Sequence, residues 1–165
     1  MVTDRQPASP RDDRLPEAQA GATLRRARTA LVSSLPSDSH TWNLVFLELL
    51  LREQGYEVFN LGSCVPTDQL LEQCLRFNPD VVVLSSVNGH GHIEAREAIA
   101  AIRSNPDLKD TAVVVGGKLG VLGEGNTQFT AGLLAAGFDA VFTDSASPEQ
   151  FRRYLSERTN VDQLT

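Results

Sequence analysis

The sequence has few of the features that mark secreted, membrane-bound or disulfide-stabilised proteins. Its 165 residues include two cysteines, Cys64 and Cys74, too few and too widely spaced for a disulfide framework or a cysteine-based zinc site. No Cys-x-x-Cys pattern or neighbouring basic residue marks either as reactive, so both are expected to be packed thiols. No run approaches the ~20 apolar residues of a membrane span, and Pro, Arg and Asp interrupt the N-terminus too often for a secretion signal. We therefore expect a cytoplasmic protein without membrane insertion.

An excess of basic residues is also missing. The chain has 15 Lys and Arg against 21 Asp and Glu, a net charge of −6, which argues against a nucleic-acid partner. The balance is uneven, because residues 1–28 hold six Arg and four acidic residues. The chain from Thr29 onward therefore has 9 basic and 17 acidic residues, a net charge of −8, and its acidic surface is expected to face a partner protein.

The chain is expected to hold one domain. Residues 1–28 are poor in large apolar residues and rich in Pro, Arg and Asp, which predicts a disordered tail whose arginines either steer an acidic partner or have no role. Residues 29–158 are enough for a folded core, and residues 159–165 form a short C-terminal tail. In a body of this size, demanding chemistry would need a cofactor, a second chain, or both.

From Thr29 onward, short apolar runs alternate with longer amphipathic segments. Leu44, Leu47 and Leu51 have the spacing of one helix face, and Gly55 and Gly137 are typical residues at helix ends. The predicted strands are Thr29–Ser34, Glu57–Leu61, Asp80–Ser86, Thr111–Val115 and Ala140–Thr143. The predicted helices are Trp42–Gln54, Thr67–Phe77, Ile93–Ser104, Asn126–Ala136 and Pro148–Glu157.

Five strand–helix units in strict alternation predict an α/β fold, a flavodoxin-like or Rossmann-like three-layer sandwich with a five-stranded parallel sheet and helices on both faces. Val81–Leu84 and Ala112–Val115 are continuous apolar runs, as expected for strands buried on both sides. Ligands of such sheets bind outside the carboxyl ends of the strands. The predicted loops at that edge are Leu35–Asn43, Gly62–Pro66, Ser85–His92 and Gly116–Gly125, and they contain all three histidines.

Asp38 and His40 are the sharpest local feature. A carboxylate two residues from an imidazole can accept a hydrogen bond from one ring nitrogen and raise the basicity of the other, as happens beside metal-ligating histidines. Alternatively, Asp38 or Ser39 caps the following helix and His40 is an exposed residue of its first turn. The sequence spacing alone leaves both interpretations open.

The other loops give weaker signals. Gly116 and Gly117, with Gly120, Gly123 and Gly125, form either a loop that a ligand approaches closely or an ordinary glycine-rich turn, and match neither a P-loop nor a dinucleotide motif. The pair His90 and His92 could chelate a metal, although loop residues that line a ligand are favoured because no third ligand lies nearby. Ser85 and Ser86 lack the Gly-x-Ser-x-Gly pattern of a hydrolase nucleophile.

Taken together, the loops resemble the cobalamin-binding domain family, and within it the small subunit of glutamate mutase (methylaspartate mutase). The family pattern is Asp-x-His-x-x-Gly after the first strand, Ser-x-Leu after the third and Gly-Gly after the fourth. The corresponding residues here are Asp38–Asn43, Ser85–Val87 and Gly116–Gly117. The resemblance covers about residues 29–157.

The resemblance implies a cobalamin whose dimethylbenzimidazole tail is detached and buried beside the sheet. His40 would be the lower axial cobalt ligand, Asp38 its hydrogen-bond partner, and Ser85 a contact of the benzimidazole. Gly116 and Gly117 would leave room for the tail. The full set of implied cofactor-binding residues is Asp38, Ser39, His40, Thr41, Asn43, Ser63, Val65, Pro66, Ser85, Val87, Asn88, Gly89, His90, Gly116 and Gly117.

By the same resemblance, the chain would be the adenosylcobalamin-binding subunit of a carbon-skeleton mutase, an isomerase that interconverts L-glutamate and threo-3-methylaspartate. A separate barrel subunit would hold the substrate, and this chain would supply no catalytic residue beyond the cobalt ligand. Asn43 stands where the family has Gly, and Val87 where it has Leu. Two alternatives therefore stay open, a corrinoid carrier for a methyltransferase and a non-catalytic flavodoxin-like binding or sensor module.

Overall fold

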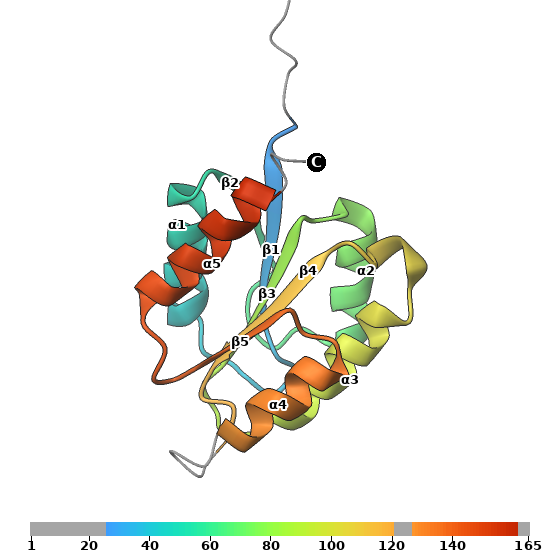
Figure 1. Ribbon diagram of the computed structural model, residues 1–165. Coiled ribbons are helices and arrows are strands. Elements are labelled where there is room, and N and C mark those ends of the chain that lie inside the picture. Colours follow the sequence, from blue (N-terminus) through green and yellow to red (C-terminus); the bar gives the residue numbers. More distant parts are fainter. Residues whose placement is uncertain (1–25, 121–126, 162–165) are drawn as a thin grey trace, which may run out of the picture.

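The computed structural model describes residues 26–120 and 127–161, in which five strands alternate with helices (Figure 1). The strands are β1 (Arg28–Ser34), β2 (Tyr56–Asn60), β3 (Val81–Ser86), β4 (Ala112–Gly117) and β5 (Ala140–Thr143). The helices are α1 (Trp42–Glu53), α2 (Thr67–Phe77), α3 (Gly91–Arg103), α4 (Thr127–Ala136) and α5 (Pro148–Val161), with a short 3-10 turn, η1 (Pro106–Leu108). No helix in these ranges is long and apolar enough to cross a membrane.

The strands form one parallel sheet in the order β2-β1-β3-β4-β5. Helices α1 and α5 cover one face, and α2, α3 and α4 cover the other (Figure 1). This confirms the predicted flavodoxin-like three-layer sandwich. The chain reverses its direction of winding between β1 and β3, so the loops that follow these two strands diverge to opposite faces and leave a crevice, the usual ligand position in this fold.

The central strands supply a core on each face of the sheet. Leu31, Val82 and Val113 pack against α2, α3 and α4 on one face, and Val32, Val83 and Val114 pack against α1 and α5 on the other. All six side chains are at most 3% exposed. The continuous valine runs of β3 and β4 are therefore apolar because both of their faces are covered.

Most predicted elements lie within a few residues of their predicted ranges, and the differences at the carboxyl edge are corrections. Gly116 and Gly117 belong to β4 and not to the loop after it, and α3 begins at Gly91, which places His92 in the helix. β1 begins at Arg28 and α5 continues to Val161. The described residues do not include 1–25 and 162–165, where tails were predicted. They also do not include Gly123 and Gly125 of the predicted glycine-rich loop.

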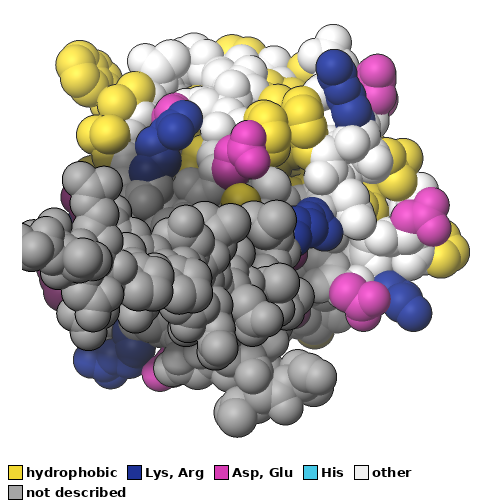
Figure 2. Space-filling view, turned by 90° about the horizontal axis from the view of Figure 1, so that it is seen from above, with side chains coloured by type: hydrophobic (Ala, Val, Ile, Leu, Met, Phe, Trp, Pro, Cys, Tyr) yellow, Lys and Arg dark blue, Asp and Glu magenta, His cyan; other side chains and the backbone are white. Residues whose placement is uncertain are grey.

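The candidate loops all lie at the carboxyl edge of the sheet, the lower edge in Figure 1. Figure 2 views the opposite edge, where acidic and basic side chains are interspersed and no histidine is visible.

Candidate functional site

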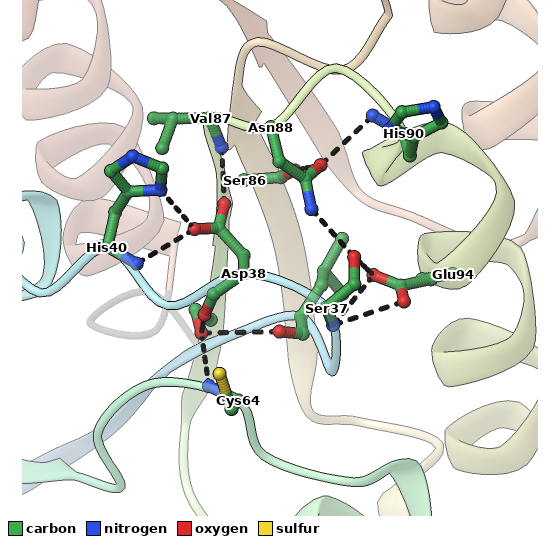
Figure 3. Close-up of polar contacts among 11 residues, drawn as sticks. Ser37, Asp38, His40, Cys64, Ser86, Val87, Asn88, His90 and Glu94 are labelled. Carbon is green, nitrogen blue, oxygen red and sulfur yellow. Dashed lines mark hydrogen bonds and ion pairs between the residues drawn. The ribbon is translucent and has the colours of Figure 1, made fainter.

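Asp38 is a buried carboxylate between the loop after β1 and the loop after β3. It is 1% exposed, and its two oxygens accept hydrogen bonds from three donors (Figure 3). Oδ1 accepts from the backbone N–H of His40 at 3.0 Å and lies 2.7 Å from His40 Nδ1. Oδ2 accepts from the backbone N–H of Val87 at 2.5 Å. The carboxylate therefore joins the two loops that border the crevice.

The hydrogen-bond donors around Asp38 determine whether its carboxyl group is ionised. Burial alone would raise the pKa of the carboxyl group, because it disfavours the charged form. The backbone N–H groups of His40 and Val87, and then the His40 ring, favour the carboxylate and together hold its pKa below the ordinary value. Asp38 is thus ionised at neutral pH and accepts the Nδ1 proton of His40.

The His40 ring is 59% exposed while its partner is buried. In the neutral ring, a proton on Nδ1 that is donated to Asp38 leaves the lone pair on Nε2, which makes no hydrogen bond to the described part of the chain. The alternative in which Asp38 or Ser39 caps α1 is wrong, because Thr41 is the N-cap residue and no side chain caps the helix. The pair therefore has the geometry of a histidine ligand oriented by a carboxylate.

Further contacts that the sequence patterns did not reveal hold the Asp38 loop. The Ser34 hydroxyl donates to the Asp38 carbonyl at 2.6 Å, and the same carbonyl accepts from the backbone N–H of Cys64 at 3.0 Å. The Glu94 carboxylate on α3 accepts from the N–H and hydroxyl of Ser37 at 2.9–3.3 Å. Ser37 is 57 residues from Glu94 in sequence, and no local pattern marks such a contact.

A cavity of about 250 Å³ lies between α1, α5 and the carboxyl halves of β3, β4 and β5. Apolar side chains supply most of its wall, and the polar lining includes Asn43 and Ser85. The main lining residues are Asn43, Phe46, Leu47, Leu50, Val83, Ser85, Val115, Gly116, Gly117, Phe142, Thr143, Asp144, Ser147 and Phe151. Four predicted site residues from three different motifs therefore share one cavity: Asn43, Ser85, Gly116 and Gly117.

The two glycines of β4 line this cavity, but neighbouring strands also require them. A Cβ atom on Gly117 would lie 2.1 Å from the Ser86 carbonyl oxygen, and the Gly117 φ of +102° disfavours any side chain. A Cβ atom on Gly116 would lie 3.0 Å from the Phe142 carbonyl oxygen. Their role in the structure is thus close strand packing at the edge of the cavity.

The other predicted site residues occupy the surrounding loops. Ser63 is partly exposed, whereas Val65 is buried in the core between the sheet and α2, and Pro66 is the N-cap of α2. Asn88 Oδ1 accepts from the His90 backbone N–H at 3.0 Å, and Asn88 Nδ2 donates to Ser37 Oγ at 2.6 Å. Ser39 and Thr41 are exposed beside His40, and Gly89 has a φ of +81°.

Histidines 90 and 92 have no third ligand for a metal site among the described residues. His92 Nδ1 lies 2.9 Å from the Leu119 carbonyl oxygen, and its ring stacks on Phe129. Among residues 26–120 and 127–161, no group of three or more His, Cys, Asp or Glu could hold a metal ion. The prediction of packed thiols is right for Cys74, which is buried, and wrong for Cys64, which is exposed.

A single exposed imidazole with an oriented lone pair can be an axial ligand to a metal that brings its other ligands with it, as in a metal macrocycle. The neighbouring cavity could take a flat, largely apolar group of that molecule. Comparisons with known proteins identify the family of the chain. Residues 28–142 match the B12 binding domain family.

Curated relatives of the chain include glutamate mutase sigma subunits. The protein from Carboxydothermus hydrogenoformans is 31% identical over 121 residues, which are 73% of this chain and 88% of that relative. The protein from Halobacterium salinarum is 28% identical, over 82% of this chain and 89% of that relative.

Two solved structures illustrate the likeness in fold. A cobalamin-binding protein from Desulfitobacterium hafniense superposes with a TM-score of 0.63 at 23% identity, over 79% of this chain and 59% of that protein. The response regulator CheY4 of Vibrio cholerae gives a TM-score of 0.57 at 17% identity, over 79% of this chain and 98% of that protein. At these low sequence identities, the two superpositions show a shared fold only. The family assignment rests on the match of residues 28–142 to the B12 binding domain family. The chain belongs to the B12-binding domain family.

Proposed function

We propose that this chain is the cobalamin-binding subunit of an adenosylcobalamin-dependent isomerase that interconverts L-glutamate and threo-3-methylaspartate. The observation that carries the proposal is the 2.7 Å contact between the buried Asp38 carboxylate and Nδ1 of the exposed His40 ring. The glutamate mutase sigma subunits among the relatives support the choice of reaction.

His40 would bind the cobalt through Nε2, with Asp38 fixing the tautomer and the orientation of the ring. The three hydrogen bonds to Asp38 support this role, because they keep its carboxylate ionised and in place. When bound, adenosylcobalamin supplies a cobalt–carbon bond whose homolysis generates the radical for the rearrangement. This chain's own contribution would be to bind and orient the cofactor.

The nucleotide tail of the cofactor would enter the cavity beside α1. Ser85 and Asn43 line this cavity and would contact the tail, and Gly116 and Gly117 border the same space. The Asn43 amide makes no hydrogen bond to the described residues, so it is available to donate one to the tail. This supports a role for Asn43 at the position where the family has Gly.

The remaining loop residues would surround the corrin ring. Those proposed near it are Ser39, Thr41, Ser63, Pro66, Val87, Asn88, Gly89 and His90, together with Val65, which would lie near it only through its backbone because its side chain is buried. The substrate pocket would be on a separate barrel subunit, and this chain would be inactive without it. The long-range contacts of Ser37 with Glu94 and Asn88 would hold the His40 loop in position for that assembly.

Electron paramagnetic resonance of the cobalt(II) form tests the ligand. The protein is labelled with 15N-histidine, loaded with hydroxocobalamin and reduced. If His40 binds the cobalt, the superhyperfine splitting changes from the triplet of 14N to the doublet of 15N. A spectrum that keeps the triplet would exclude histidine as the ligand.

Two variants identify which histidine binds the cobalt. His40→Asn should lose the doublet, whereas His90→Asn, which changes another exposed loop histidine, should retain it. Turnover of glutamate with the candidate barrel subunit then tests the reaction separately from cofactor ligation. Activity only with a methyl donor would favour a methyltransferase carrier instead.

A further inference from the structure

Glu94 lies in the first turn of α3, yet its carboxylate contacts the loop that contains His40. Both of its oxygens accept from the Ser37 backbone N–H, at 3.1 and 3.3 Å, and one also accepts from the Ser37 hydroxyl at 2.9 Å (Figure 3). One carboxylate therefore holds the backbone and the side chain of the same residue. Hydrogen bonds to a charged acceptor are about twice as strong as bonds between neutral groups.

The Ser37 hydroxyl is the middle of a chain of hydrogen bonds. It accepts from Asn88 Nδ2 at 2.6 Å while it donates to Glu94. Asn88 Oδ1 in turn accepts from the backbone N–H of His90 at 3.0 Å and from the Ser86 hydroxyl at 3.3 Å. Because donors and acceptors alternate toward the carboxylate, each bond polarises the next. The charge of Glu94 therefore sets the direction of the whole chain.

This chain of bonds runs beside the contacts of Asp38. Ser37 directly precedes Asp38 in the loop after β1, and their partners across the crevice, at positions 88 and 87, are also adjacent in sequence. Two neighbouring bridges restrain a loop against rotation better than one bridge does. The Asp38 N–H also donates to the Leu35 carbonyl at 3.0 Å, which closes a tight turn that contains Ser37. A displacement of Ser37 would therefore also move Asp38.

The first turn of α3 is a firm support for Glu94. Gly91 lies so close to the end of β3 that a Cβ atom there would be 2.5 Å from the Ser86 hydroxyl oxygen. The backbone N–H of His92 donates to the Leu119 carbonyl at 3.0 Å. A side chain on such a packed element positions its partner more precisely than one on a loop.

We propose that Glu94 is a positioning residue for the His40 ring, which it reaches through the Ser37–Asp38 segment. The inference rests on the proposed function, in which His40 binds the cobalt. Without Glu94, the loop would lose its bridge to α3, and the chain of bonds through Asn88 would lose its last acceptor. The His40 ring would then adopt orientations and tautomers that do not present Nε2, and ordering it would oppose binding.

A purely structural role for Glu94 is the competing explanation. An acidic side chain in the first turn stabilises a helix through the helix dipole, without any contact to a neighbouring loop. Such a role would change the free energy of unfolding and leave the tautomer of His40 in the folded chain as it is. The tautomer therefore distinguishes positioning from stability.

Nitrogen NMR of the full-length chain without corrinoid is the first measurement, at about pH 9, where an ordinary imidazole is neutral. The chain has three histidines, and His40→Asn assigns the signals of His40 in 15N-histidine-labelled protein. The wild-type ring should have its proton on Nδ1. Glu94→Ala should show a mixture of tautomers, and Glu94→Gln, with one acceptor oxygen, should lie between the two. Glu97→Ala removes the same charge from an exposed position on α3 and should match the wild type.

Absorbance titration with hydroxocobalamin is the second measurement. Glu94→Ala should raise the dissociation constant about tenfold, the lower end of the effect of losing a group that orients a metal-ligating histidine. Ser37→Ala removes the hydroxyl and keeps the N–H, so its effect should be smaller. In the double variant, the loss should be less than the product of the two single losses, because both residues act through one contact.

Circular dichroism establishes first that each variant is folded. A wild-type His40 tautomer in Glu94→Ala would overturn the proposal, and so would an unchanged dissociation constant. Failure of the proposed function has a different signature, because the wild type itself would then lack the 15N doublet of the cobalt(II) form. The NMR measurement contains no corrinoid, so it tests the role of Glu94 in either case.

Discussion

At the scale of single residues, the site depends on one carboxylate with three donors. Asp38 is too buried to be solvated, so its charge is stabilised by the N–H groups of His40 and Val87 and by the His40 ring. The same contacts determine which nitrogen of the ring is free. Changes at Asp38 are therefore expected to alter both cofactor binding and stability.

Replacing Asp38 with Asn should weaken cobalamin binding by about 10–100-fold, the usual effect of losing the carboxylate that orients a metal-ligating histidine. The neutral amide accepts more weakly from Nδ1–H, and no longer offers two oxygens to both His40 and Val87. Absorbance titration with hydroxocobalamin measures the affinity. Asp68→Asn, at an exposed aspartate in the first turn of α2, should leave it unchanged; equal losses in both variants would contradict the role of Asp38.

Acid should destabilise the wild type more than Asp38→Asn. The folded pKa of Asp38 lies below its ordinary value of 3.8, so the unfolded chain binds the proton first as the pH falls. The stabilisation is therefore complete above the unfolded pKa and is lost as the pH falls toward the folded pKa. Urea unfolding between about pH 5 and pH 3 should give a steeper loss of free energy in the wild type. Parallel curves would show that Asp38 contributes nothing to the pH dependence.

At the scale of secondary-structure elements, the carboxyl ends of β3 and β4 leave no room for a side chain at Gly117. Gly117 pairs with Ser86 in the sheet, and its missing side chain lets the two backbones meet. This contact lies at the border of the cavity and one residue before Val87, which donates to Asp38. The geometry of the site therefore depends on this strand pair.

Gly117→Ala should cost about 2–4 kcal/mol of unfolding free energy, from a disfavoured φ together with a clash against the Ser86 backbone. Gly62→Ala separates the two causes. Gly62 has a φ of +85° but open space around its Cβ position, so this variant should lose about 1 kcal/mol. Urea denaturation measures both, and equal losses would mean that the contact with Ser86 is not the reason for Gly117.

The sequence was sufficient to predict the elements that have a clear periodicity. The valine runs of β3 and β4 and the Leu44, Leu47 and Leu51 face of α1 were read correctly because burial determines their spacing. The end of β4 was predicted wrongly, because a Gly-Gly pair is also typical of a loop. The exposure of Phe46 and Leu49 could not be foreseen either, since an apolar residue in a helix does not by itself show what covers it.

At the scale of the whole molecule, the fold brings motifs that are far apart in the sequence to one edge of the sheet. The Asp38–His40 pairing was one of two interpretations that their local spacing left open, and the meeting of three motifs followed from the parallel topology. The contact between Ser37 and Glu94 was not predictable, because it joins two elements across the crevice without any repeating pattern. A cytoplasmic location stays a prediction.

Cobalamin should stabilise the whole chain, since a ligand that binds only the folded state raises its unfolding free energy. The gain should be about 2.7 kcal/mol at a concentration 100 times the dissociation constant. Cobinamide, which lacks the nucleotide tail, should bind more weakly and stabilise less at the same concentration if the cavity beside α1 takes the tail. Thermal unfolding with each corrinoid measures the difference, and identical shifts would argue against that use of the cavity.

The two oxygens of Asp38 contact different loops. Oδ1 contacts His40, and Oδ2 accepts a hydrogen bond from Val87 on the opposite side of the crevice. Because one carboxylate contacts both loops, the orientation of the His40 ring depends on the position of the loop after β3 as well as on the position of its own loop.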